Sequence, residues 1–151
     1  MNANRIAVVL ALMLLTIAPN LHAACSNESL HGTYGYFSQG FVSVTADISP
    51  ALFLPQAQTG LVNFDGKGVV TSGTYTINST DPTGEVGRGT FTGTYVINSD
   101  CTGTFESHPD IGGSLHYDLV VLSPTELVAM ASDVGGSQIY SAKKIRGAEE
   151  R

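Results

Sequence analysis

Basic side chains are scarce in this chain of 151 residues, which has 7 Lys and Arg residues against 13 Asp and Glu residues. Proteins that bind nucleic acids neutralise phosphates with clustered Lys and Arg, and anionic membrane surfaces attract the same residues. The composition therefore argues against nucleic acid and against an anionic membrane face as partners. Solubility alone explains the acidic surface, because net charge keeps a protein dispersed.

Long apolar runs are equally scarce. The single extended one, Ile6–Ile17, follows Arg5 and ends before Pro19 and the small pair Ala23-Ala24. It is too short to span a bilayer, and this order of charge, apolar stretch and small residues is that of a secretory signal peptide. We predict a signal peptide over 1–23, no membrane-spanning segment, and an exported protein that is periplasmic or extracellular.

The remainder is the size of one domain. We predict a single β-domain over 24–145, followed by a charged flexible tail over 146–151. Without Arg5, six basic residues stand against 13 acidic ones, which gives the mature chain a net charge of −7.

Only two cysteines are present, Cys25 and Cys101. In an oxidising compartment they form one intramolecular disulfide, which would stabilise the fold by about 4 kcal/mol by restricting the unfolded chain. The alternative is a lipoprotein with a lipid on Cys25. A lipobox has Leu three residues before its Cys, and that position is His22, so we expect the disulfide.

Runs of strong helix formers are also missing. Residues 25–30 offer one short helical turn, and the rest is rich in Gly, Thr and Val with alternating polarity. Asp65-Gly66-Lys67-Gly68 is a strong hairpin turn. Residues 41–48 fit a strand or an ordered loop, and the prolines in 50–58 argue against a long strand there. Strands are predicted over 32–40, 59–64, 69–78, 87–98, 103–107, 114–122, 126–132 and 137–145.

Short connections between these eight strands make neighbours antiparallel. A sheet of this many strands must curl, close or divide into two layers. Because closure removes exposed edges, we predict an all-β fold with a closed up-and-down barrel, and a two-sheet sandwich as the alternative.

The alternation of apolar and polar residues along two of the strands predicts which face of each strand is buried. Phe91 and Tyr95 alternate with threonines such as Thr92, and the apolar series Leu115, Tyr117, Leu119 and Val121 repeats the pattern around His116. A register slip of one residue would bury the threonines. We predict that Phe91, Tyr95, Leu119 and Val121 face the core and that Thr92 and His116 face water.

Three segments carry a resemblance: CSNESLHGTYGY (25–36), LVNFDGKGVV (61–70) and GTYVINSDCTGTF (93–105). Together they resemble a group of uncharacterised bacterial secreted β-proteins, in which Cys-Ser-Asn, N-F-D-G-x-G and D-C-T-G-T recur in this order. The resemblance implies a bacterial host and no known chemistry. The expected fold also resembles the calycin and allene-oxide-cyclase-like barrels, a fold-level likeness that assigns no function.

Catalytic and metal-binding motifs are weak in this sequence. His108, Asp110, His116 and Asp118 offer imidazole and carboxylate ligands, but their spacing matches no metal motif, and we interpret them as solvated side chains. There is no G-x-S-x-G elbow. Glu85, Glu106 and Glu126 are scattered along the sequence and do not predict a pair of catalytic carboxylates. We predict no catalytic residues, no metal and no cofactor.

Aromatic residues remain the most informative group. An eight-stranded barrel is wide enough to hold one small ligand, and inward tyrosines would give an apolar cup polar handles. The aromatic series comprises Tyr34, Tyr36, Phe37, Phe64, Phe91, Tyr95, Phe105 and Tyr117, with Phe37 on the opposite face from Tyr34 and Tyr36. The candidate ligand-binding residues are Tyr34, Tyr36, Phe91, Tyr95 and Tyr117.

Three hypotheses for function follow. The first is a secreted or periplasmic, non-enzymatic binding or interaction module that holds a small apolar molecule in the barrel. The second is an enzyme of the cyclase or isomerase kind with an apolar, Tyr-lined cavity. The third is a structural, surface-associated protein with a filled core. A buried carboxylate beside the tyrosines would favour the enzyme, because acid–base chemistry needs a titratable group.

Overall fold

The computed structural model describes residues 24–43, 53–79 and 86–145. The predicted signal peptide (1–23), the later part of the 41–48 segment and the charged tail (146–151) lie outside the described residues. No helix within these three ranges is long and apolar enough to cross a membrane.

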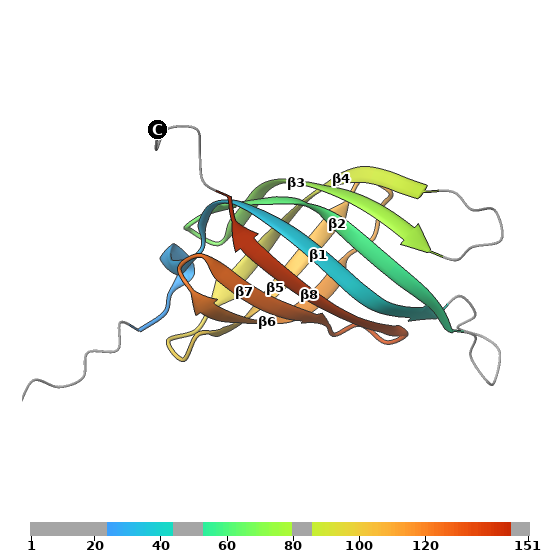
Figure 1. Ribbon diagram of the computed structural model, residues 1–151. Coiled ribbons are helices and arrows are strands. Elements are labelled where there is room, and N and C mark those ends of the chain that lie inside the picture. The colour runs from blue at the N-terminus through green and yellow to red at the C-terminus, as the bar shows by residue number, and fades with distance from the viewer. Residues whose placement is uncertain (1–23, 44–52, 80–85, 146–151) are drawn as a thin grey trace, which may run out of the picture.

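Eight antiparallel strands form a closed barrel in up-and-down order, with β1 paired to both β2 and β8 (Figure 1). The predicted barrel is therefore confirmed, and the sandwich alternative is wrong. The strands are β1 (His31–Ser43), β2 (Phe53–Asp65), β3 (Val69–Ser79), β4 (Val86–Ile97), β5 (Thr102–Pro109), β6 (Leu115–Ser123), β7 (Glu126–Ala131) and β8 (Gly136–Lys144).

Strand β2 differs from the sequence-based prediction. It begins at Phe53 and continues through Pro55, where a long strand was not expected. Pro55 pairs with Phe41 of β1, whereas the ladder between β2 and β3 starts only at Gln56. One edge of β2 is therefore unpaired in the described structure at Pro55, and a residue without an N–H is tolerated at such an edge.

The N-terminal segment closes one end of the barrel. A single 3-10 turn, η1 (Asn27–Ser29), follows Cys25, whose predicted disulfide to Cys101 is present. The Asn27 side chain accepts a hydrogen bond from the backbone N–H of Ile97 at 2.8 Å. Leu30 is fully buried, and its carbonyl accepts a hydrogen bond from the Tyr95 hydroxyl at 3.0 Å. We call this the plugged end, and the opposite end the far end.

Inward positions of the strands form one core. Phe91, Tyr95, Leu119 and Val121 are buried as predicted, whereas Thr92 and His116 are exposed. Leu115 departs from the pattern of its strand, because as the first residue of β6 it lies at the rim of the barrel and is exposed.

Glycines make room for the aromatic rings inside the barrel. A Cβ at Gly73 would lie 2.2 Å from the ring of Phe91, and one at Gly93 would lie 2.7 Å from the ring of Phe105. Both distances are too short for carbon atoms, so each ring occupies the space that a larger residue on the neighbouring strand would fill. Aromatic residues on one strand thus lie against glycines on the next, which allows the close packing that a protein core requires.

The hairpin between β2 and β3 has the predicted turn chemistry. Asp65 Oδ1 accepts hydrogen bonds from the backbone N–H groups of Lys67 at 2.7 Å and Val69 at 2.9 Å. These bonds hold the pKa of the Asp65 carboxyl below its usual value. Gly66 and Gly68 adopt φ of 78° and 110°, a conformation that side chains with a Cβ resist.

We expect Gly66→Val or Gly68→Val to lower the free energy of unfolding by about 1–3 kcal/mol, because a β-branched residue resists positive φ. Denaturant melts would measure the loss, with the neighbouring Lys67→Ala as a control that keeps both glycines. If both glycine variants stayed within about half a kcal/mol of wild type, the turn would not depend on this conformation.

Candidate ligand site inside the barrel

Five aromatic side chains form a closed circuit inside the barrel. Each ring contacts the next, with neighbouring centroids 5.0 to 6.3 Å apart. Most of the pairs are tilted or edge-to-face, the geometries that aromatic rings prefer. We call this set the aromatic ring. Its members come from β1, β4, β5, β6 and β8, and they are Tyr36, Phe91, Phe105, Tyr117 and Tyr140.

The side of the aromatic ring nearer the plugged end is apolar and packed. Tyr34 contacts Phe64 edge to face at 5.4 Å, and Phe64 contacts Tyr95 at 5.1 Å. The Tyr34 hydroxyl donates to the carbonyl of Pro124 at 2.9 Å, and the Tyr95 hydroxyl donates to the carbonyl of Leu30 in the N-terminal segment. Both hydroxyls thus have hydrogen-bond partners within the protein.

On the side of the far end, several inward positions of β1, β2 and β8 are polar and uncharged. We call Ser38, Gln56, Gln58 and Gln138, together with the hydroxyls of Tyr36 and Tyr140, the polar layer. These groups follow the aromatic residues at intervals of two along β1 and β8, and they line the inner face of β2. They therefore converge from three adjacent strands onto one region of the interior.

Hydrogen bonds connect most of the polar layer. Gln58 Nε2 donates to the Tyr36 hydroxyl at 2.9 Å, and that hydroxyl donates to the carbonyl of Thr74 at 3.1 Å. The Tyr140 hydroxyl bonds to the amide oxygen of Gln138, whose Nε2 donates to the amide oxygen of Gln56. The layer is a chain of neutral donors and acceptors.

Ser38 is the exception in this network. Its side chain is 3% exposed, and among the described residues its Oγ has no hydrogen-bond partner. A buried hydroxyl without a partner costs about 1–3 kcal/mol of stability. Such groups in native structures call for an explanation, and an ordered water or an ion is one of the accepted ones.

Electrostatics keep this region neutral. Burial raises the pKa of Tyr36, Tyr117 and Tyr140 above the usual phenol value. Ser38, Ser107 and Gln138 are the buried polar residues of the described part of the chain, so none of its Asp, Glu, Lys, Arg or His residues is buried. The phenols therefore remain hydrogen-bond donors across the physiological pH range.

Asp110 is the carboxylate at the rim of the far end. Its Oδ1 accepts a hydrogen bond from the Tyr75 hydroxyl at 2.9 Å, and its Oδ2 accepts one from the backbone N–H of Thr90 at 2.8 Å. The bond from Thr90 contributes most to lowering the pKa of Asp110. The carboxylate thus links the β5–β6 loop to β3 and β4, and both of its oxygens already accept hydrogen bonds.

The five candidate ligand-binding residues divide into two groups. Tyr34 and Tyr95 belong to the packed apolar side, whereas Tyr36, Phe91 and Tyr117 belong to the aromatic ring that borders the polar layer. Their ligand role stays a prediction.

Sequence reasoning missed Tyr140 and the polar layer. The signal was present, because Ser38 lies two residues after Tyr36 and Gln138 lies two residues before Tyr140, so each pair shares a face. Following the alternation past the aromatic residues would have found them.

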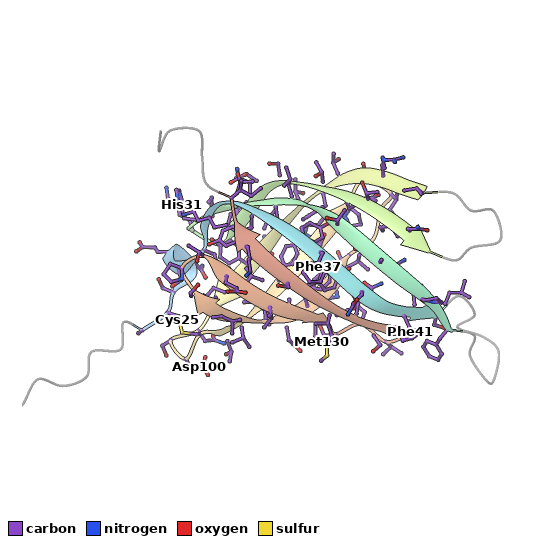
Figure 2. The ribbon with its side chains drawn as sticks, in the orientation of Figure 1. Cys25, His31, Phe37, Phe41, Asp100 and Met130 are labelled. Carbon is purple, nitrogen blue, oxygen red and sulfur yellow. A yellow bond between two sulfur atoms is a disulfide. The ribbon has the colours of Figure 1, made fainter. Side chains whose placement is uncertain are left out.

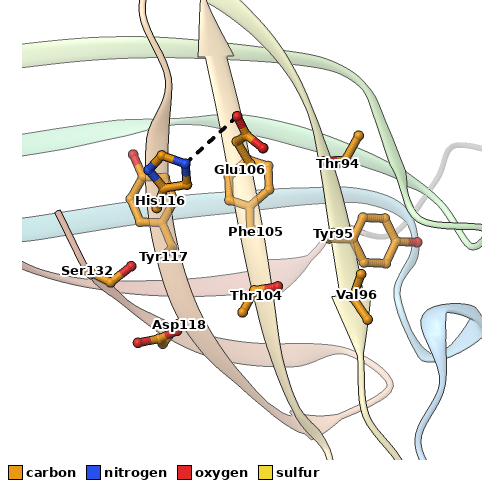
Figure 3. Close-up of a pocket in the computed structure, with 10 residues that line it drawn as sticks. All are labelled: Thr94, Tyr95, Val96, Thr104, Phe105, Glu106, His116, Tyr117, Asp118 and Ser132. Carbon is orange, nitrogen blue, oxygen red and sulfur yellow. Dashed lines mark ion pairs between the residues drawn. The ribbon is translucent and has the colours of Figure 1, made fainter.

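His108 and His116 lie on the outer surface. His116 Nδ1 is 2.8 Å from Asp133 Oδ1, and its Nε2 is 3.8 Å from Glu106 Oε1, beside a hollow on the outside of β4, β5 and β6 (Figure 3). The hydrogen bond to Asp133 raises the pKa of His116. Within the described ranges, no group of three or more His, Cys, Asp or Glu side chains is placed to hold a metal ion.

No protein-family model and no curated protein matches this chain. The candidate site therefore stands on its own geometry. That geometry consists of an apolar half closed by the plug, an aromatic ring, and a neutral polar layer facing the far end.

Proposed function

We propose that the protein is an exported, non-enzymatic binding module that holds a small uncharged molecule against the polar layer. The observation that carries the proposal is the unpaired, buried hydroxyl of Ser38 beside converging amide and phenol groups. A ligand that hydrogen-bonds to Ser38 would pair this buried hydroxyl, and that bond would contribute to its affinity.

The chemistry of the polar layer sets the ligand class. Amide and hydroxyl groups offer both donors and acceptors, and burial would penalise a charged ligand that finds no opposite charge. A compact neutral molecule that carries hydroxyl, carbonyl or amide groups fits best. The apolar surface of such a molecule would rest on the aromatic ring, so the proposed ligand is more polar than the small apolar molecule expected from the sequence.

The enzyme alternative has weaker support. A cyclase or isomerase that moves protons needs a group with a pKa near neutrality, and the phenols of the aromatic ring have raised pKa values. Asp110, at the rim, is held ionised by its hydrogen bonds. A binding role requires only the neutral donors and acceptors that are present.

Ser38→Ala separates binding from folding. If the hydroxyl is kept for a ligand, the variant should raise the free energy of unfolding by about 1 kcal/mol, because an unpaired buried polar group is removed, and it should lose the ligand. Native mass spectrometry of protein purified from its own host would detect the co-purified molecule. Thr92→Ala, on the outer surface of β4, is the control that should change neither measurement.

Two results would contradict the proposal. Wild-type protein without any bound molecule, combined with Ser38→Ala of unchanged stability, would support the structural protein with a filled core. A bound molecule that Ser38→Ala retains in full would place the binding site elsewhere on the protein.

A further inference from the structure

The hydrogen-bond ladder between β7 and β8 stops short of the far end of the barrel. Its last pair joins Ile139 to Met130, which projects outward from the barrel (Figure 2). Beyond this pair, the described residues 131–138 form no further ladder between the two strands. Strand β7 follows β6 as far as Ala131, and β8 follows β1 from Gly136 onward. This end of the hairpin is therefore held by β6 and β1 rather than by a ladder of its own.

A single residue of β6, His116, makes three hydrogen bonds with the turn between β7 and β8 (132–135). The carbonyl of His116 accepts a bond from the N–H of Ser132 at 2.9 Å, and its own N–H donates to Asp133 Oδ2 at 2.7 Å. Its ring Nδ1 lies 2.8 Å from Asp133 Oδ1. Both oxygens of this carboxylate are thus directed at the same residue.

The charged groups that face His116 are acidic, apart from one other histidine. Strand β5 contributes Glu106, whose Oε1 is 3.8 Å from His116 Nε2 (Figure 3) and 3.8 Å from His108 Nδ1. The turn contributes Asp133, and β6 itself contributes Asp118, two residues along the same face. No Lys or Arg within the described ranges forms an ion pair with these groups. These surroundings favour a protonated imidazole.

We infer that His116 and Asp133 form a pH-dependent clasp, which holds the β7–β8 turn against β6 while His116 is protonated and loosens as that proton is lost. The protonated ring gives Asp133 a charge-assisted hydrogen bond, which is about twice as strong as a neutral one. The neutral ring keeps at most a neutral donor at Nδ1 and loses its attraction to Glu106. Because no ladder joins β7 to β8 at this level, loosening the clasp loosens the turn.

The direction of the pH dependence follows from the two titrating groups. The hydrogen bond to Asp133 raises the pKa of His116, and the bond from the His116 backbone N–H does most to lower the pKa of Asp133. The contribution of His116 is complete below its unfolded pKa of about 6.5 and is lost as the pH rises through the raised folded value. The contribution of Asp133 is lost only as the pH falls through its lowered folded value. The clasp is therefore closed in mildly acidic solution and loosens in alkaline solution.

The clasp has a consequence for the interior of the barrel. Gln138 of the polar layer lies on β8 in the stretch that has no ladder to β7. Loosening the turn would open a route from solvent to the polar layer at this point. That consequence rests on the proposed function, whereas the clasp is a property of the fold and can be measured without any ligand.

Amide hydrogen exchange, followed by NMR at about pH 5.5 and about pH 8.5, tests the clasp on the purified, oxidised protein. After correction for the intrinsic exchange rates, the amides of Ser132 and His116 should be about 3-fold less protected at the higher pH, the effect expected for an exposed ion pair. The amide of Val121, which donates to the carbonyl of Cys101 at the plugged end, is the internal reference and should not change.

His116→Gln keeps a hydrogen-bond donor but cannot gain a charge, so it should abolish the difference between the two pH values. His108→Gln is the matched control, because His108 is equally close to Glu106 but bonds to Ser114 of the β5–β6 loop; this variant should behave as wild type does. Asp133→Asn serves as a second variant in case His116→Gln fails to fold, and circular dichroism would verify the barrel in each.

Two outcomes would overturn the clasp. One is wild-type protein in which the amides of Ser132 and His116 are equally protected at both pH values. The other is a pH difference that persists in His116→Gln, because the turn would then respond to a different titrating group.

Discussion

Phe91→Ala is expected to lower the free energy of unfolding by about 3–5 kcal/mol, the range for truncating a buried aromatic side chain. Phe91 is a member of the aromatic ring and lies 6.3 Å from both Tyr36 and Phe105, measured between ring centroids. It also fills the space above Gly73, which has no side chain to collapse into the cavity. Urea melts followed by circular dichroism would measure the loss.

Thr92→Ala is the matched control for Phe91→Ala, since Thr92 is the next residue of β4 and points outward. Its effect should be within about half a kcal/mol. Equal losses for the two variants would contradict the assignment of the inner face. Intact stability of Phe91→Ala with loss of the bound molecule would instead place Phe91 in direct contact with the ligand.

Removing the disulfide is expected to cost about 4 kcal/mol, because Cys25 and Cys101 are 76 residues apart and a cross-link over such a loop strongly restricts the unfolded chain. The loss should be seen in melts of the Cys25→Ala, Cys101→Ala double variant. The intact mass of the wild-type protein should be two hydrogens below the reduced value. Two reactive thiols in unfolded, unreduced protein, or a diacylglycerol adduct on Cys25, would contradict the bond.

Much of the fold follows from alternation in the sequence. The period of two along β4 and β6 was strong enough to assign Phe91, Tyr95, Leu119 and Val121 to the inside, and Asp65 with two glycines marked the hairpin. These features are local, since each depends on residues close together in the chain. Pro55 misled the prediction because its acceptability depends on where β3 ends, which no local pattern contains.

The candidate site was harder to predict for the same reason. Period two places Ser38 on the face of Tyr36, but it does not reveal that Gln58 and Gln138 flank them from the neighbouring strands. That proximity depends on the pairing of β1 with β8, between residues such as Ser38 and Tyr140 that are about a hundred positions apart. These inward polar residues indicate a site only once the pairing of β1 with β8 in the closed barrel is known, because that pairing brings them together.

The pairing of β1 with β8 also has a consequence for how the chain folds. One edge of β1 has no partner until residues 136–144 have been synthesised, so the barrel cannot form progressively from its N-terminus. Contacts between residues so distant in the chain make folding slow, typically milliseconds to seconds for all-β domains. During that interval the exposed edges of β1 and β7 can pair with other chains, and both edges disappear only when β8 docks between them and closes the barrel.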